Sequence, residues 1–238
     1  MIRSYPMTLT VATAAAIFLS GCGSERSAAM AEGYDQRPAL EGTLFPSDQT
    51  NIGDDAIKRI LDGKVVIADK VMIAVMPLGC GDGGSPGYAG AIQATITERV
   101  QREARVLGIE RIPTLILSPQ RRDIPRIREA CARLQCDLVL LYSVRQEVKV
   151  HNRLFAKDEA KAFATIEAVL MDVRTGMIPW TDVVDNDITA IQDADHDAWE
   201  RAVTASVQAA TAGMAEDLAK FFAKLPPRAA APSAPRTN

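Results

Sequence analysis

The chain has 238 residues, of which 47% are hydrophobic and 24% charged, and its formal net charge is −3. This composition is typical of a globular protein and excludes a disordered or fibrous one. A net charge of −3 argues against a protein built to coat nucleic acid, because such binding needs a basic surface, and a content of 5% aromatic residues leaves few surfaces on which bases could stack. We therefore expect no nucleic-acid partner.

The amino terminus has the pattern of an export signal. Arg3 precedes a largely apolar run of 13 residues, Met7 to Leu19, which is too short to span a bilayer. The run leads into the sequence Leu-Ser-Gly-Cys, which resembles the lipobox of bacterial lipoproteins. In a lipobox the cysteine thiol is acylated and the signal is cut just before it. The resemblance implies that Cys22 is the lipidation site, that cleavage falls between Gly21 and Cys22, and that residues 1–21 are the signal peptide.

The residue after the cysteine is Gly23 and not Asp, the usual signal for retention in the inner membrane of Gram-negative bacteria. The resemblance therefore implies an outer-membrane lipoprotein that faces the periplasm. The two or three acyl chains of such proteins anchor stably, whereas one chain binds only marginally. Residues 22–50 lack an apolar period and are predicted to be a flexible tether. Four prolines in residues 226–238 predict a disordered tail, which leaves residues 51–225 as a single domain.

The first half of this domain alternates strands with helices. Val71–Met76 and Leu138–Tyr142 are nearly unbroken apolar runs, typical of strands buried on both faces, and Thr114–Leu117 is a weaker third candidate. Apolar residues at steps of three or four predict one helix from Tyr88 to Leu107 and another from Ile124 to Leu134. Alternation of this kind indicates βαβ units with parallel strands.

The second half predicts an antiparallel pair. Apolar residues alternate with others in Ala164–Leu170, so this strand is expected to have a more exposed face. A turn at residues 174–176 would lead into Met177–Val183, and Pro179 restricts that strand to an edge of the sheet.

A long amphipathic helix ends the predicted domain. One apolar stripe runs from Trp199 to Leu225, and Pro226 stops it. Asp197 and Glu200 resemble a capping box at its start. The predicted fold class is α/β, with a mixed, mostly parallel sheet of about five strands flanked by helices.

Glycine-rich residues 83–87 match the G-x-S-x-G pattern of a hydrolase nucleophile elbow, with Ser85 as nucleophile. Asp182 and His196 would complete a triad in the order Ser, Asp, His. However, the residue after the nucleophile must donate its backbone N–H to the oxyanion, and Pro86 has none. A mobile surface loop is the favoured interpretation, and a serine hydrolase that uses Ser85 is the alternative.

No metal site or cofactor site is predicted. Asp193, Asp195 and Asp197 alternate as in a calcium loop, but the required Gly and Glu are missing at the sixth and twelfth positions. Carboxylates before a helix also stabilise its positive end without a metal. The only histidines, His151 and His196, have no paired Cys or His spacing, which argues against zinc.

Three cysteines besides Cys22 would lie in an oxidising compartment. Cys131 lies on the apolar stripe of its helix and is expected to be a buried thiol. Cys80 and Cys136 are expected at opposite ends of the parallel strands, so the disulfide to expect, if one forms, joins Cys131 to Cys136. Arginines also surround a short predicted helix, and for them a solvated face is the favoured interpretation and contact with acidic lipid or glycan the alternative. These are Arg121, Arg122, Arg126, Arg128 and Arg133.

Two segments carry a family resemblance. Residues 134–144 read LQCDLVLLYSV and residues 170–180 read LMDVRTGMIPW. They resemble a strand and a hairpin of the envelope lipoproteins that share a domain with the TolB amino-terminal region, the curli-secretion lipoprotein CsgG and the penicillin-binding-protein activator LpoB. Leu44–Asp48, Ile112-Pro113 and Phe221-Phe222 are also similar to rhombotail lipoproteins.

This resemblance runs from about Phe45 to Leu225 and implies an envelope lipoprotein with an α/β domain. No catalytic residue belongs to the pattern. A pore of the curli type would need long amphipathic hairpins, and the sequence shows no such alternation. We therefore expect a non-enzymatic protein-interaction module in cell-envelope assembly or maintenance, accessory to a peptidoglycan synthase or to a secretion or assembly complex. Its sheet edge or loops would bind the envelope partner.

Overall fold

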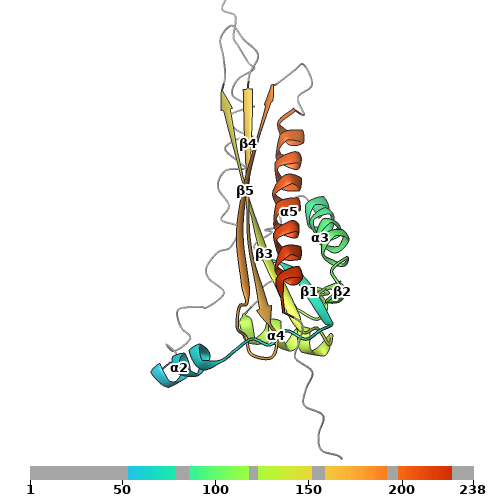
Figure 1. The fold of residues 1–238 in the computed structure, drawn as a ribbon. Helices are drawn as coiled ribbons and strands as arrows, with labels where there is room; N and C mark the ends of the chain where they lie inside the picture. The colour runs from blue at the N-terminus through green and yellow to red at the C-terminus, as the bar shows by residue number, and fades with distance from the viewer. Residues whose placement is uncertain (1–52, 79–85, 118–122, 152–158, 192–197, 227–238) are drawn as a thin grey trace, which may run out of the picture.

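In the computed structural model, the described residues are 53–78, 86–117, 123–151, 159–191 and 198–226. They form one five-stranded sheet with four helices (Figure 1). The helices are α2 (Asp54–Asp62), α3 (Pro86–Val100), α4 (Ile124–Arg133) and α5 (Ala198–Lys224). The strands are β1 (Val71–Pro77), β2 (Val106–Arg111), β3 (Leu138–His151), β4 (Glu159–Asp172) and β5 (Trp180–Ile191).

The sheet has the strand order β2-β1-β3-β4-β5. Strand β1 runs parallel to both β2 and β3, whereas β4 runs antiparallel to both β3 and β5. The expected five-stranded mixed sheet with flanking helices and a long C-terminal helix is confirmed. Parallel and antiparallel pairings are equal in number, so the sheet is less parallel than the apolar runs indicated.

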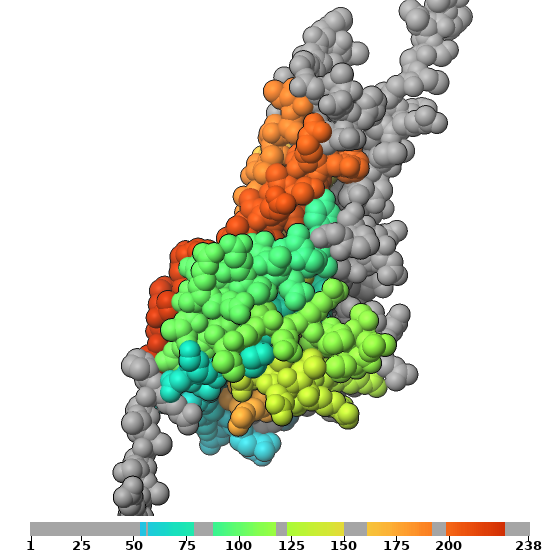
Figure 2. Space-filling view, turned by 90° about the vertical axis from the view of Figure 1, so that its right-hand side faces the viewer, coloured from blue at the N-terminus to red at the C-terminus, as the bar shows by residue number. Residues whose placement is uncertain are grey.

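Helices α3 and α5 lie on one face of the sheet (Figure 1), and their surfaces adjoin in the space-filling view (Figure 2). The core between these helices and the sheet contains inward-facing residues of β1, β3 and β4. It also contains residues of α5 such as Met214 and Phe222, which are 0% and 2% exposed. Helix α4 covers the other face over β1, the first part of β3 and the last part of β4, where Ile127 shares a core cluster with Val139 and Met171. Strand β1 and the first part of β3 are therefore covered on both faces, whereas the outer parts of β3, β4 and β5 extend beyond α4.

The prediction of the third strand is wrong. Thr114–Leu117 contains turns, and the strand beside β1 is β2, Val106–Arg111. Helix α3 ends at Val100 and not at Leu107. Leu107 satisfies the helical spacing by chance, and Gly108, Glu110 and Arg111 interrupt the apolar pattern of the true strand.

The antiparallel strands are also longer than predicted. Strands β3 and β4 pair over 14 residues each, and β5 alternates between half-buried and exposed residues over 12. The expectation that long amphipathic hairpins are missing is therefore wrong. Polar residues such as Gln146 and Glu147 hid the continuation of β3. One face of these hairpins packs on α5, and β5 is the edge strand that Pro179, the residue before its start, predicted.

The turn between β4 and β5 is built by local hydrogen bonds. Asp172 Oδ1 accepts from the Thr175 backbone N–H at 2.6 Å and from the Thr175 hydroxyl at 2.7 Å. Gly176 follows with φ of +76°, a conformation that favours glycine. Its N–H donates to the Asp172 carbonyl at 2.8 Å, which closes the predicted turn at residues 174–176.

Helix α2 was not predicted. It is the first described element and stands at the end of the molecule where α4 and the β4–β5 turn lie (Figure 1). Gly63 follows it, and a Cβ on Gly63 would lie only 2.7 Å from Met177 Cε. Glycine therefore permits the close approach of this segment to the β4–β5 turn.

Candidate interaction surface

Most sequence-predicted site residues lie outside the described part of the chain. These are the lipidation and cleavage residues Cys22 and Gly21, the nucleophile candidate Ser85, and His196. The alternating aspartates Asp193, Asp195 and Asp197 also lie outside it, together with Cys80, Arg121 and Arg122. Of the three triad candidates the structure describes only Asp182, so the rest of the predicted triad lies outside the described residues.

Asp182 lies on the edge strand β5, in an unusual setting for a carboxylate. Its Oδ1 accepts a hydrogen bond from the Val183 backbone N–H at 3.0 Å, and its Oδ2 is buried without a hydrogen-bond partner in the structure. Burial, and then the negative charge of Asp217 on α5, raise the pKa of Asp182.

The outer edge of β5 is the longest free strand edge among the described residues. Strand β5 pairs with β4 along its whole length: Trp180 lies opposite Leu170 at one end, and Ile191 lies opposite Glu159 at the other. No described strand pairs with the other side of β5. The opposite edge of the sheet, β2, has 6 residues against 12 in β5. An edge of this length is a template for an added strand. Two apolar side chains, Val183 and Ile191, are 63% and 62% exposed there.

Beyond α4, the face of β3, β4 and β5 that turns away from α5 is polar. Arg145 forms an ion pair with Glu167 at 2.8 Å across β3 and β4, and the Thr165 hydroxyl donates to Asp185 at 2.6 Å across β4 and β5. Lys161 pairs with Asp187 at 2.8 Å. These side chains hold their cross-strand partners and are half-exposed or exposed, so this face is a solvated one.

Both described cysteines are free thiols in the structure, and both are buried. Cys131 lies in the last turn of α4, and Cys136 lies just beyond its end. Gln135 has φ of +56°, and behind it the Cys136 N–H donates to the Cys131 carbonyl at 2.9 Å, the pattern of a Schellman motif. Burial raises the pKa of Cys131 to about 12 and that of Cys136 to about 11. These thiols are therefore protonated and poorly nucleophilic. The disulfide stays a prediction.

The described arginines near α4 have structural partners. Arg128 donates from Nε to the Val173 carbonyl at 2.8 Å and also hydrogen-bonds the Arg174 carbonyl, which ties α4 to the β4–β5 turn. Arg126 pairs with Asp123, whose side chain caps α4, and Arg133 pairs with Glu129. These contacts use the positive charges within the fold, so the three residues do not form an unpaired basic patch.

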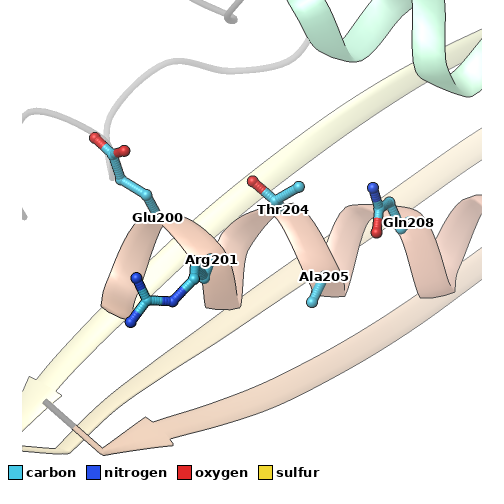
Figure 3. A pocket seen from close by; sticks show the side chains of 5 residues that line it. All are labelled: Glu200, Arg201, Thr204, Ala205 and Gln208. Carbon is cyan, nitrogen blue, oxygen red and sulfur yellow. The ribbon is translucent and has the colours of Figure 1, made fainter. Parts of the chain in front are cut away.

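A shallow hollow runs along the first part of α5 (Figure 3), lined by Glu200, Arg201, Thr204, Ala205 and Gln208. Glu200 and Thr204 point to one side of the helix and Arg201 to another (Figure 3). The Thr204 side chain is engaged with Tyr88 of α3, since the two hydroxyl oxygens are 2.9 Å apart. Because the polar groups do not converge, the hollow lacks the arrangement of a small-molecule site.

Within the described ranges, no three His, Cys, Asp or Glu side chains gather as metal ligands. In the same ranges, no helix combines the length and the apolar character that crossing a bilayer requires.

Two surface features were missed by the sequence analysis. The full length of the β5 edge was missed because Asp182, Asp185 and Asp187 interrupt its apolar pattern, although Val184, Ile188 and Ala190 continue the period of two. The exposed helix α2 carries Ile57, Ile60 and Leu61, and their spacing was the signal that predicts it.

No family model matches the sequence, and neither does any curated protein. Among solved structures the chain is similar to a minor lipoprotein from Acinetobacter baumannii, with 7% identity, 64% of this chain and 92% of that chain covered, and a TM-score of 0.38. It is also similar to a lipoprotein from Neisseria meningitidis, with 16% identity, 58% of this chain and 96% of that chain covered, and a TM-score of 0.34. A third similar structure is the PelC dodecamer from Paraburkholderia phytofirmans, with 14% identity, 67% of this chain and 93% of that chain covered, and a TM-score of 0.36. Each of these similarities is distant and concerns the backbone alone.

Proposed function

We propose that this chain is a non-enzymatic lipoprotein, anchored in the outer membrane through Cys22 and facing the periplasm, that binds an envelope protein along the free edge of β5. The observation that carries the proposal is the 12-residue edge strand whose outer side no described strand covers. An extended segment of a partner would add to β5 through backbone hydrogen bonds, and its side chains would contact Val183 and Ile191. The partner would belong to a peptidoglycan synthase or to a secretion or assembly complex.

Charge on β5 favours a basic segment over a second copy of the same strand. Asp185 and Asp187 are exposed, and one residue, Asn186, separates them. Two antiparallel copies of β5, paired near their middle, would bring these carboxylates together, and like charges across a pair are destabilising. A partner strand with Lys or Arg opposite Asp185 would instead meet a carboxylate that has no cationic partner among the described ion pairs of β5, whereas Asp187 already pairs with Lys161. The same aspartates therefore disfavour pairing of the β5 edge with a second copy of itself.

Site-specific photocrosslinking in intact cells tests the edge. A photoreactive residue is placed at position 183 or 191, and the control carries it at position 107. Leu107 is 62% exposed, as Ile191 is, but lies on β2 at the opposite edge of the sheet. We expect a discrete adduct from positions 183 and 191, no adduct from position 107, and loss of the adduct in the Asp185→Lys, Asp187→Lys double variant. Equal adducts from all three positions, or none from the β5 positions, would contradict the proposal.

The anchor is tested separately by detergent partition. The Cys22→Ala chain cannot receive an acyl chain at position 22, so we expect it to leave the detergent phase, whereas the parent stays in it. If the variant partitions as the parent does, the anchor is not at Cys22.

A further inference from the structure

We propose that helix α2 lies in the membrane interface, with Ile57, Ile60 and Leu61 among the lipids. The proposal rests on the lipid anchor of the proposed function and deepens it, because it says which end of the domain contacts the bilayer. The occupant of this apolar face is the lipid surface, and not a protein.

The sequence of α2 separates apolar from charged residues around the helix. Ile57, Ile60 and Leu61 follow the i, i+3, i+4 spacing and share one side. The charged residues occupy the other side. They are Asp54, Asp55, Lys58, Arg59 and Asp62. A helix with one apolar and one charged side is suited to a boundary between water and an apolar phase.

The described fold leaves much of the apolar side exposed. Ile57 is 41% exposed, Ile60 is 48% exposed and Leu61 is 77% exposed, and none of them belongs to a core cluster. Helices shorter than about 12 residues are marginal in water even for favourable sequences. Helix α2 has 9 residues, and no side chain caps its start. The helix therefore needs a covering surface.

The position of α2 in the chain points to lipid as that surface. It is the first described element after Cys22, and about 30 residues separate the two. Treated as a coil, a segment of this length has a root-mean-square span of roughly 30 Å. The acyl chains on Cys22 would thus hold α2 at a high local concentration of lipid, so that three apolar side chains suffice for contact.

A second copy of α2 is a poorer occupant. A helix of nine residues is only about 14 Å long, and a stable dimer buries roughly 800 Å² on each partner. Three side chains on two and a half turns offer much less than that area. The charges of α2, three acidic and two basic, also nearly cancel, which favours a surface bound through apolar contact over one bound through charge.

The place of α2 in the fold gives the domain an orientation. Helix α2 lies at the same end of the molecule as α4 and the β4–β5 turn, opposite the far end of the β3–β4 hairpin (Figure 1). Ile178 of that turn is 38% exposed, and Gly63 approaches its neighbour Met177 closely. Contact of α2 with lipid therefore places the β4–β5 turn near the membrane and directs the far hairpin end away from it.

Lipid contact can be measured by fluorescence quenching in the full, lipidated chain. Leu61→Cys and Lys58→Cys are each labelled with the same environment-sensitive fluorophore in a Cys80→Ser background. The proteins are reconstituted in vesicles of phosphatidylethanolamine with a minority of phosphatidylglycerol, with and without brominated acyl chains. Both positions are exposed in the fold, so neither substitution disturbs the core, and the Lys58 position lies on the charged side of the same helix.

We expect brominated lipid to quench the label at position 61 several-fold more than the label at position 58. Replacing Ile57 and Ile60 by Asp should abolish this difference while the protein still floats with the vesicles. Equal quenching at the two positions overturns the proposal, and so does a label at position 61 that is shielded from water but not quenched by brominated lipid, because a protein would then cover α2. A chain that does not float with vesicles at all overturns the lipid anchor as well, so the two failures are distinguishable.

Discussion

Arg99 on α3 donates a hydrogen bond from Nε to Oε2 of Glu216 on α5 at 2.5 Å, and thereby joins the two helices that cover one face of the sheet. The same guanidinium pairs with Glu103 at 2.8 Å. The hydrogen bond with Arg99 lowers the pKa of Glu216. The contact is therefore a link between helices whose strength depends on pH.

Glu216→Gln should destabilise the fold near neutral pH and matter less in acid. Because the pKa of Glu216 is lowered in the folded state, its contribution is present above the unfolded pKa of about 4.3 and is lost as the pH falls through the lower folded value. Urea unfolding at about pH 7 and about pH 2 measures the difference in midpoint between variant and parent. The control is Glu98→Gln, because Glu98 and its partner Arg102, four residues on, are 75% and 66% exposed and do not link α3 to α5. A midpoint difference that stays constant with pH would contradict the assignment.

Cys131 and Cys136 should resist alkylation in the folded protein. With pKa values raised to about 12 and about 11, both remain thiols at about pH 8, and burial also blocks the reagent. Peptide mapping after iodoacetamide treatment, with and without denaturant, measures the labelling of each residue. We expect labelling only after unfolding. If the unfolded, unreduced chain still takes no label at either position, the two cysteines form the disulfide instead.

Met214→Ala should lower the free energy of unfolding by about 2–5 kcal/mol, because it leaves a cavity in the core between α5 and the sheet. Met214 is 0% exposed. Leu115→Ala is the matched control, since Leu115 is 99% exposed and its replacement should change stability by less than about 0.5 kcal/mol. Chemical unfolding measures both. Equal effects would show that α5 does not pack on the sheet as described.

Two glycine substitutions should have opposite signs. Gly176→Ala should cost about 1 kcal/mol, because Gly176 has φ of +76°. Gly90→Ala should stabilise by roughly 0.5–1 kcal/mol, because Gly90 lies inside α3 and a Cβ there would meet nothing within 4 Å. Thermal and urea unfolding of the two variants measure these effects. A stabilising Gly176→Ala would contradict the assigned turn.

The sequence predicted those elements whose pattern is strong within a single segment. The apolar stripe of α5 and the buried runs of β1 and β3 are of this kind, and all three lie where they were expected. Strand β2 failed because Leu107 fits a helix as well as a strand, and only the pairing of Ile109 with Ile73 of β1 resolves the choice.

The candidate surface was harder to predict than the core. The acidic residues of β5 are unfavourable in strands, and they are held there by pairing with β4 and by packing of the alternate residues on α5. Whether a strand edge is free depends on the order of all five strands, which no local pattern carries. The sequence therefore predicted the edge position of this strand from Pro179, but not its length.

Strand β3 passes through two environments, and its amides should exchange with solvent accordingly. From Leu138 to Tyr142 it is enclosed by α3 and α5 on one face and α4 on the other. Beyond Ser143 it leaves the cover of α4, and Arg145 and Lys149 are exposed. The first part should therefore open only when the whole domain unfolds, whereas the outer part can open by itself at a lower free energy. A single continuous strand would then connect the most stable part of the protein to a part that can rearrange without unfolding it.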